Sequence, residues 1–323
     1  MTKTDTLPRR ALGDTGLTLP ILSLGSWHIY DRMHYGDAVE MVRHAVDAGL
    51  NMFDIGVYGT PETTPPPMTD VLFSAIARGA GLARDDYVLS EKLWLEGFDA
   101  DQGFRPQLDN ALFRVGTDHA DLVVLGDVRD PETDLRAVVE SLGDLHRAGL
   151  IRAWGVNNWS AENIEHVKRL AADLGVSPPS MAQLKYSVAR RAIPDGAPFA
   201  ALFEDGLALQ ASDVMEGGVL VKPSPPEREV GRDPGNIRER IAGAARDLAP
   251  LAESFGATPA ELCIAFTLTH PALVNTLVGT SRMSQLEQAL NAVGLVDRIG
   301  ADTLRAAVEP LWCDKGIVDP KGP

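Results

Sequence analysis

The sequence predicts a (β/α)8 TIM barrel, a closed ring of eight parallel strands alternating with helices, with an N-terminal β-hairpin and extra C-terminal helices. Short apolar runs alternate with amphipathic segments along all 323 residues without a shift in composition. This is the pattern of βαβ units in one domain spanning residues 1–323. No G-x-G-x-x-G follows any of the runs. The doubly wound dinucleotide-binding sheet, the other architecture that this alternation permits, is therefore disfavoured.

Each element is placed by its hydrophobic period and by the turn residues that bound it. The hairpin is predicted over residues 9–20, around a Gly13-Asp14-Thr15-Gly16 turn. The strands of the barrel are predicted at 21–25, 51–54, 87–90, 121–125, 151–156, 181–184, 207–211 and 274–278. The helices are predicted at 35–48, 69–78, 107–115, 131–148, 160–174, 199–204, 237–254, 259–269, 284–293 and 301–311. The tail 314–323 is expected to be loose or to lie over the surface.

The composition, 45% hydrophobic and 23% charged, is that of a soluble globular chain. The net charge is −15 and no cluster of Lys and Arg stands out, so nucleic acid and acidic membranes are disfavoured as partners. The N-terminus lacks the apolar core of a signal peptide and no run of 18 apolar residues occurs. We therefore expect a cytoplasmic protein. Cys263 and Cys313 are expected to be free thiols, and no His/Cys cluster has metal-site spacing.

Three side chains that handle protons follow two neighbouring strands of the predicted barrel. Asp54 and Tyr58 come at the end of one strand, and Lys92 comes at the end of the next. The active site of this fold lies at the C-terminal strand ends, so we expect the three to meet there. An ammonium beside a phenol lowers the phenol's pKa from about 10, and a carboxylate keeps the lysine charged. The alternative is a surface ion pair with an unrelated loop tyrosine.

Over nearly its whole length the chain resembles the aldo-keto reductase family. The matching segments keep the family's order and spacing: Leu22–Trp27, Asn51–Asp54 with Tyr58, Ser90–Lys92, Ile151–Ser160, Gln183 and Val278–Arg282. The resemblance implies a metal-free, NADPH-dependent reductase of a small aldehyde or ketone, acting as a monomer or weak homo-oligomer. In that family's scheme Tyr58 donates the proton, Lys92 lowers its pKa and Asp54 anchors the lysine.

The resemblance also implies which residues would hold NADP(H). The nicotinamide amide would be held by residues matching Asn157, Asn158 and Gln183, with Ser212 nearby. The adenosine phosphate would lie near Gly279, Ser281 and Arg282, at a helix start where N–H groups and the helix dipole favour anions. The loop Val221–Pro234 would cover the pyrophosphate, with Lys222 and Arg228 available there.

Four departures from the family's pattern stand in the same segments. Gly126 occupies the position of the histidine that polarises the carbonyl, and Asp54 and Tyr58 are four positions apart where the family has five. The stretch Ala211-Ser212-Asp213-Val214 stands where the family commonly has a Tyr-Ser-Pro pattern, whose aromatic residue stacks on the nicotinamide. Gln288-Ala289 replaces an acidic and amide pair that usually contacts adenine. The side chains that are candidates to replace the histidine are His28, Asp127 and Asp213.

These departures keep two other functions open. The first is a non-redox acid/base enzyme on the same barrel, catalysing an elimination or isomerisation. The second is a protein that binds NADPH without turnover. Trp27, Trp94 and Trp159 follow strands of the predicted barrel, and they would either line a substrate pocket or pack at the rim.

Overall fold

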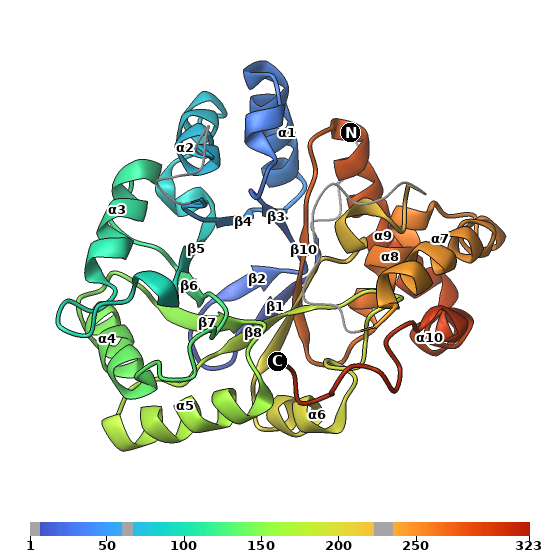
Figure 1. Cartoon of the computed structure of the whole chain (residues 1–323). Coiled ribbons are helices and arrows are strands. Elements are labelled where there is room, and N and C mark those ends of the chain that lie inside the picture. Colours follow the sequence, from blue (N-terminus) through green and yellow to red (C-terminus); the bar gives the residue numbers. More distant parts are fainter. Residues whose placement is uncertain (1–6, 60–66, 223–234) are drawn as a thin grey trace.

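Eight parallel strands close into a barrel in the order β10-β3-β4-β5-β6-β7-β8-β9, which confirms the predicted fold class (Figure 1). The structure is a computed structural model, and it describes residues 7–59, 67–222 and 235–323. The strands are β3 (Leu22–Gly25), β4 (Met52–Ile55), β5 (Val88–Leu93), β6 (Leu122–Leu125), β7 (Ala153–Asn157), β8 (Met181–Lys185), β9 (Ala208–Ser212) and β10 (Leu273–Val278).

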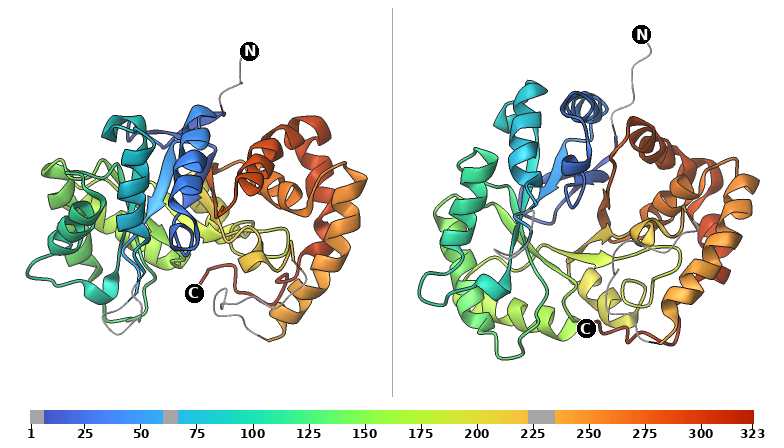
Figure 2. Two further views of the ribbon diagram at one scale, coloured as in Figure 1. Left: turned by 90° about the horizontal axis from the view of Figure 1, so that it is seen from above. Right: turned by 45° about the horizontal axis from the view of Figure 1, so that its top comes forward.

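Helices surround the barrel and cover the outward faces of its strands (Figures 1 and 2). They are α1 (Tyr35–Asp47), α2 (Thr69–Gly79), α3 (Arg105–Val115), α4 (Leu135–Arg147), α5 (Ala161–Leu174), α6 (Ala197–Glu204), α7 (Ile237–Ser254), α8 (Pro259–Leu268), α9 (Met283–Ile299) and α10 (Ala301–Ala307). Short 3-10 helices occupy Tyr30–Arg32, Arg84–Asp86, Leu95–Gly97, Glu216–Gly218 and Glu309–Leu311. Among the described residues, no helix is long and apolar enough to cross a membrane.

Several predicted boundaries were wrong, and three of them have a clear local reason. The fourth helix begins at Leu135 and not at 131, because the Asp134 carboxylate caps it. The ninth continues past Gly294 to Ile299, and ends where Gly300 adopts a φ of 88°. The last helix ends at Ala307, since Pro310 cannot continue it and instead opens a 3-10 turn. The third strand of the barrel runs to Leu93, so Lys92 lies within it.

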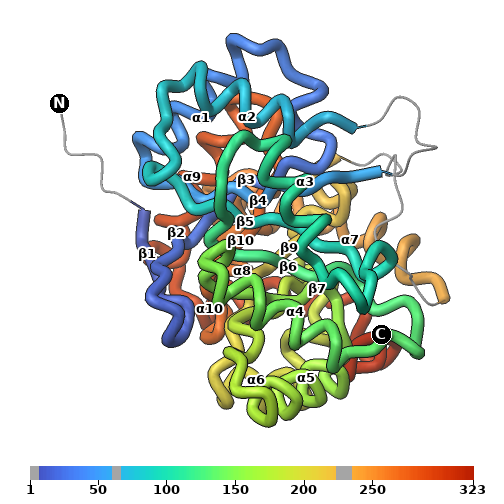
Figure 3. Tube along the Cα trace, turned by 90° about the vertical axis from the view of Figure 1, so that its left-hand side faces the viewer, coloured from blue at the N-terminus to red at the C-terminus, as the bar shows by residue number. Residues whose placement is uncertain are grey.

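The N-terminal hairpin closes one end of the barrel. Strands β1 (Arg9–Ala11) and β2 (Thr18–Pro20) pair antiparallel, and Figure 3 shows them at one end of the molecule. The hairpin leucines Leu12, Leu17 and Leu19 pack against inward-facing apolar side chains of the barrel: Met52, Leu122, Val124, Ala153, Met181 and Val274. This apolar plug leaves the opposite end, where the strands finish, for polar chemistry.

The C-terminal tail lies over the surface, which is one of the two expectations for it. The Asp314 carboxylate accepts hydrogen bonds from the backbone N–H groups of Arg191 and Ala192. Further along, the backbone carbonyl of Lys321 accepts from the N–H of Ala161, at the start of α5.

Candidate active site

A buried ion pair lies inside the barrel above the apolar plug. Asp54 of β4 and Lys92 of β5 both point inward, and the Lys92 ammonium is 3.2 Å from Asp54 Oδ2. Their side chains are only 2% and 7% exposed. Removing two charges from water is costly unless they are paired and hydrogen-bonded. The pair is therefore not the surface ion pair that the sequence left open.

A chain of amide side chains continues from this pair across the barrel. Lys92 Nζ donates to Gln183 Oε1 at 2.5 Å, and Gln183 Nε2 donates both to Asp54 Oδ2 at 3.1 Å and to Gln210 Oε1 at 2.6 Å. Gln210 then donates to Asn275, which donates to the backbone carbonyl of Pro20. Each amide oxygen in the chain faces toward the ammonium, so the hydrogen bonds of the chain all run in one direction away from Lys92.

Gln210 and Asn275 are polar residues of the site that sequence reasoning missed. Both stand inside otherwise apolar strands, and both are fully buried. The register of β10 against β9 shifts between Leu273 and Asn275. This irregularity brings Asn275 to the interior although Val274, its neighbour, also packs inside. The sequence signal that could have identified them is an amide side chain in the middle of an apolar strand.

Gly56 lets Tyr58 approach the lysine. A Cβ on Gly56 would lie 2.9 Å from Lys92 Cγ and 3.0 Å from Tyr58 Cζ. The phenol-bearing end of the tyrosine ring and the lysine stem therefore both pack against the same backbone atom. A residue without a side chain is required there. The structure thus brings together the three residues Asp54, Tyr58 and Lys92, as the sequence predicted.

The pKa of Tyr58 is raised well above its usual value, first because its hydroxyl is buried and second because the Asp54 carboxylate is close. The neighbouring Ser26 hydroxyl acts in the opposite direction. We had expected Lys92 to lower this pKa, but the net effect in this structure is upward. A neutral phenol is the form that a proton donor needs, so the tyrosine is protonated at neutral pH.

Aromatic rings enclose Tyr58. Its ring meets Trp27 edge-on with centroids 4.4 Å apart and lies 5.9 Å from Trp94. Trp27 is itself partly exposed, whereas Trp159 is buried and its indole N–H donates to the Gly126 carbonyl. Of the three tryptophans, Trp27 and Trp94 line the site and Trp159 packs in the core.

The three candidates to replace the histidine lie at different places. Asp127 lies just beyond the end of β6 and accepts a hydrogen bond from Asn157 Nδ2 at 2.7 Å. His28 packs against Trp27 and has Nδ1 3.8 Å from Asp31, with its side chain 38% exposed. Asp213 follows β9 in a loop and has a φ of 50°.

Backbone strain gathers at the same end of the barrel. Among the described residues, the non-glycine residues with positive φ are His28, Asn158, Asp213 and Glu216, with φ between 50° and 52°. They follow strands β3, β7 and β9, at the open end. Such conformations cost about 1–3 kcal/mol each and concentrate at functional sites. This observation independently locates the functional end of the barrel.

The residues expected to hold the nicotinamide lie on adjoining strand ends. Asn157 is the last residue of β7 and Asn158 follows it, with its backbone N–H bonded to the carbonyl of Gln183. Ser212 ends β9 and is buried. The side chain of Gln183 points into the barrel, where Lys92, Asp54 and Gln210 use both of its donors and one acceptor position.

The residues expected to hold the phosphate lie at the start of α9. Gly279 follows β10 and is exposed, and Arg282 is the N-cap residue of α9, also exposed. The N–H of Ser281 is bonded to Gln285 Oε1 at 3.0 Å. Of the basic residues in the long loop, Lys222 is exposed, whereas Arg228 lies outside the described residues. The pair Gln288-Ala289 lies on the same helix, where Ala289 is fully buried.

One buried carboxylic acid behind the site has no hydrogen-bond partner among the described residues. Both carboxyl oxygens of Glu91 on β5 are unpaired, and the residue is fully buried. Burial raises its pKa well above the usual value, and the nearby Asp70 and Asp54 raise it further. No group of three His, Cys, Asp or Glu residues in the described part of the chain is arranged to hold a metal ion.

These observations define a class of protein: a (β/α)8 barrel with one end plugged by a hairpin and polar residues at the other end. The sequence model of the Aldo/keto reductase family matches residues 21–299. The chain therefore belongs to the aldo/keto reductase family, which is a family of oxidoreductases. It is also similar to a putative voltage-gated potassium channel subunit beta of Schizosaccharomyces pombe (strain 972 / ATCC 24843). The two are 25% identical over 329 aligned residues, covering 94% of this chain and 93% of that protein.

Proposed function

We propose that this protein is an NADPH-dependent reductase of aldehydes or ketones in which Tyr58 donates the proton. The observation that carries the proposal is the packing of the Tyr58 phenol and the Lys92 stem around Gly56, above the buried Lys92–Asp54 pair. Membership in the aldo/keto reductase family supports the reaction class. The open, strained end of the barrel supplies the place for a substrate.

The residues at this end fit a dinucleotide. Arg282 and the N-terminus of α9 would hold the adenosine phosphate, because a helix N-terminus and a guanidinium both favour anions. Because Gly279 has no side chain, a dinucleotide could approach the backbone at the end of β10. The acceptor Oδ1 of Asn157 and the side chain of Asn158 would hold the carboxamide. When bound, NADPH supplies the hydride; Gln183 would reach it only by releasing a bond to Lys92, Asp54 or Gln210.

The residues of the chain would then act on a carbonyl lying against Tyr58. The phenol is protonated and gives its proton to the carbonyl oxygen as negative charge develops there. Lys92 stabilises the phenolate that remains, and Asp54 with the Gln183 amide holds the ammonium in place. Trp27 and Trp94 exclude water around the ring.

The loss of the histidine limits the substrates. Removing one hydrogen-bond donor to a developing oxyanion costs about 10²–10³ in rate. Carbonyls that are already electron-poor, such as 1,2-dicarbonyls, quinones and aldehydes with electron-withdrawing groups, should therefore react faster than simple ketones.

Fluorescence titration of the purified protein with NADPH, followed by turnover of this panel, tests the proposal. We expect saturable binding at tens of micromolar or below and oxidation of NADPH with the electron-poor carbonyls. No binding would overturn the proposal and would favour the non-redox acid/base enzyme on the same barrel.

A second candidate is a protein that binds NADPH without turnover. Two points favour it: the family resemblance puts Gly126 at the position of the histidine, and the relative from S. pombe is described as a putative channel subunit. Binding of NADPH with no oxidation across the whole panel would select this function.

A further inference from the structure

The backbone conformation of Gly126 is one that a residue with a side chain can adopt, but neighbouring atoms occupy the space that the side chain would need. Its φ is not in the left-handed region, and its N–H and carbonyl are fixed by Leu93 and Trp159. A Cβ at this position would lie 2.7 Å from Cε3 and 3.2 Å from Cζ3 of Trp94. The six-membered ring of Trp94 therefore fills the space that any side chain at position 126 would enter.

Trp94 is held firmly in this place. Its backbone N–H donates to Gln107 Oε1 at 3.0 Å, and its carbonyl accepts from Gln107 Nε2 at 2.9 Å. Its indole N–H donates to the carbonyl of Val57 at 2.9 Å. An indole has one donor, so this bond uses all of its donor capacity. Val57 directly precedes Tyr58, and the two rings lie 5.9 Å apart.

We propose that Trp94 is the positioning residue of Tyr58, and that the same indole forces position 126 to be glycine. The N–H fixes the backbone that carries the phenol, in a loop where Asp54 and Tyr58 are only four positions apart. The ring occupies the space above Gly126. The part concerning Tyr58 rests on the proposed function, and the steric part does not.

The catalytic part is tested with Trp94→Phe, which removes the N–H and keeps much of the ring. A misplacement of about 1 Å lowers a rate about 10²-fold, so we expect kcat to fall about 10²-fold with KM nearly unchanged. The dissociation constant for NADPH, read by fluorescence, should change less than about twofold. Trp159→Phe is the matched control, since it also removes one indole bond to a backbone carbonyl and should leave kcat of the folded enzyme unchanged.

The ionisation of Tyr58 at pH 10 can be measured without cofactor or substrate. It is the difference in tyrosinate absorbance at 295 nm between a protein that has Tyr58 and the same protein with Tyr58→Phe. In the parent protein this difference should be near zero, because burial keeps the phenol protonated. In the Trp94→Phe background the loop is released and the pKa falls toward its usual value. About half of one tyrosinate should then appear, since an ordinary tyrosine has a pKa of about 10.

The steric part is tested with a thermal double-mutant cycle. Gly126→Ala should lower Tm by about 2–6 °C in the parent, the effect of overpacking a protein of this size. In a Trp94→Leu background, where the ring is gone, the same change should cost less than about 1 °C.

The outcomes separate the two proposals. If Tyr58→Phe keeps its activity, the proposed function fails, whereas the ionisation and thermal readouts still decide on Trp94. If Tyr58→Phe is inactive but Trp94→Phe has the parental kcat and no tyrosinate at pH 10, Trp94 does not position the phenol. An equal thermal cost of Gly126→Ala in both backgrounds would overturn the steric coupling.

Discussion

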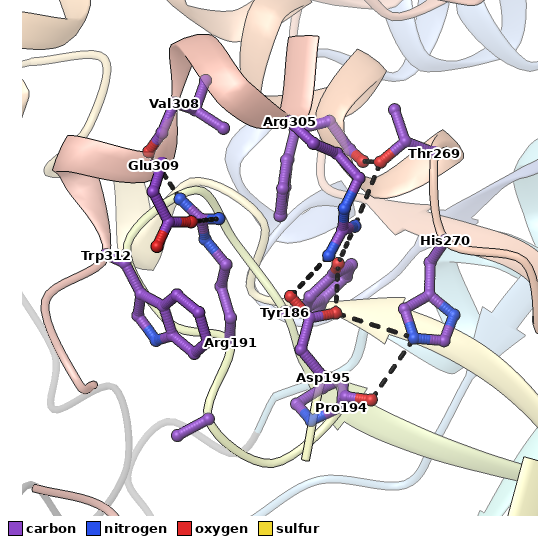
Figure 4. Close-up of polar contacts among 12 residues, drawn as sticks. Tyr186, Arg191, Pro194, Asp195, Thr269, His270, Arg305, Val308, Glu309 and Trp312 are labelled. Atoms are coloured by element: carbon purple, nitrogen blue, oxygen red, sulfur yellow. Dashed lines mark hydrogen bonds and ion pairs between the residues drawn. The ribbon is translucent and has the colours of Figure 1, made fainter. Parts of the chain in front are cut away.

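Two tyrosines of this chain each lie beside a cation and a carboxylate, yet we propose chemistry at only one of them. Tyr58 lies at the open end of the barrel beside Lys92 and Asp54. Tyr186 lies between α8 and α10, where its hydroxyl donates to Asp195 at 2.9 Å and accepts from Arg305 at 2.8 Å (Figure 4).

The two clusters differ in how their polar atoms are used. Arg305 also donates to Asp195 Oδ2 at 2.7 Å, which closes a triangle with Tyr186. His270 completes the cluster, with Nδ1 accepting from a backbone N–H and Nε2 facing the carbonyl of Pro194. Tyr186 is fully buried and both hydrogen-bonding functions of its hydroxyl are occupied. A saturated, closed cluster holds the chain together, whereas an open one beside a mouth can act on a substrate.

The largest effect on stability is expected from a second buried cluster whose hydrogen-bonding groups are occupied, the ion pair of Glu216 and Arg190. Glu216 accepts from Arg190 and Ser187, and the side chains of the ion pair are 2% and 10% exposed. Glu216→Gln should lower the free energy of unfolding by about 3–5 kcal/mol, because the change breaks a buried ion pair by removing the charge of one member. Chemical denaturation measures this. A loss below about 1 kcal/mol would show that the pair does not stabilise the fold.

The unpartnered Glu91 should behave in the opposite way. Because its pKa is raised in the folded state, the protein loses stability as the pH rises from its unfolded value of about 4.5 toward the raised value. Glu91→Gln does not titrate, so its free energy of unfolding should match that of the parent at pH 4.5. It should exceed the parent's by up to about 1.4 kcal/mol for each pH unit above that. Parallel stability curves for the two proteins from pH 5 to pH 8 would contradict the assignment.

Gly56→Ala breaks the open cluster without changing a charge. The added methyl group would lie 2.9 Å from Lys92 Cγ and 3.0 Å from Tyr58 Cζ, so the two side chains must separate. We expect kcat to fall about 10²-fold. Gly36→Ala in α1 is the control, since a Cβ there meets nothing within 4 Å and should stabilise the helix by about 0.5–1 kcal/mol. Steady-state kinetics and Tm of both variants check this, and unchanged kcat in Gly56→Ala would refute the contact.

Tyr186→Phe gives the smallest expected effect and sharpens the contrast between the two tyrosines. It leaves Asp195 and Arg305 without the hydroxyl that links them, which should cost about 1–3 kcal/mol in stability with kcat unchanged. Denaturation and kinetics on the same preparation measure both quantities. A loss of activity without a loss of stability would reverse the roles given to the clusters.

The fold and the position of the central pair followed from the sequence because they depend on local patterns. Hydrophobic period and turn residues locate the strands, and Asp54 and Lys92 fall on neighbouring strands, with Lys92 two residues beyond Ser90, the register partner of Asp54. The approach of Tyr58 to Lys92 was also predictable in outline, since Gly56 stands between Asp54 and Tyr58.

What the sequence could not supply were contacts between distant segments. The packing of Trp94 over Gly126, and the bond from Trp94 to Val57, depend on how three strand ends converge. The upward direction of the Tyr58 pKa depends on burial of its hydroxyl, which no spacing encodes. Gln210 and Asn275 become part of the site only because the barrel closes β9 against β10.

Single-turnover oxidation of NADPH by Tyr58→Phe is the most direct test of the account. The test uses a carbonyl substrate that the parent protein reduces. The variant should bind NADPH as tightly as the parent and unfold at the same temperature. Its rate of NADPH oxidation should fall by about 10²–10⁴-fold, because that is the contribution of a positioned proton donor. A rate within tenfold of the parent, with intact cofactor binding, would show that the proton comes from elsewhere.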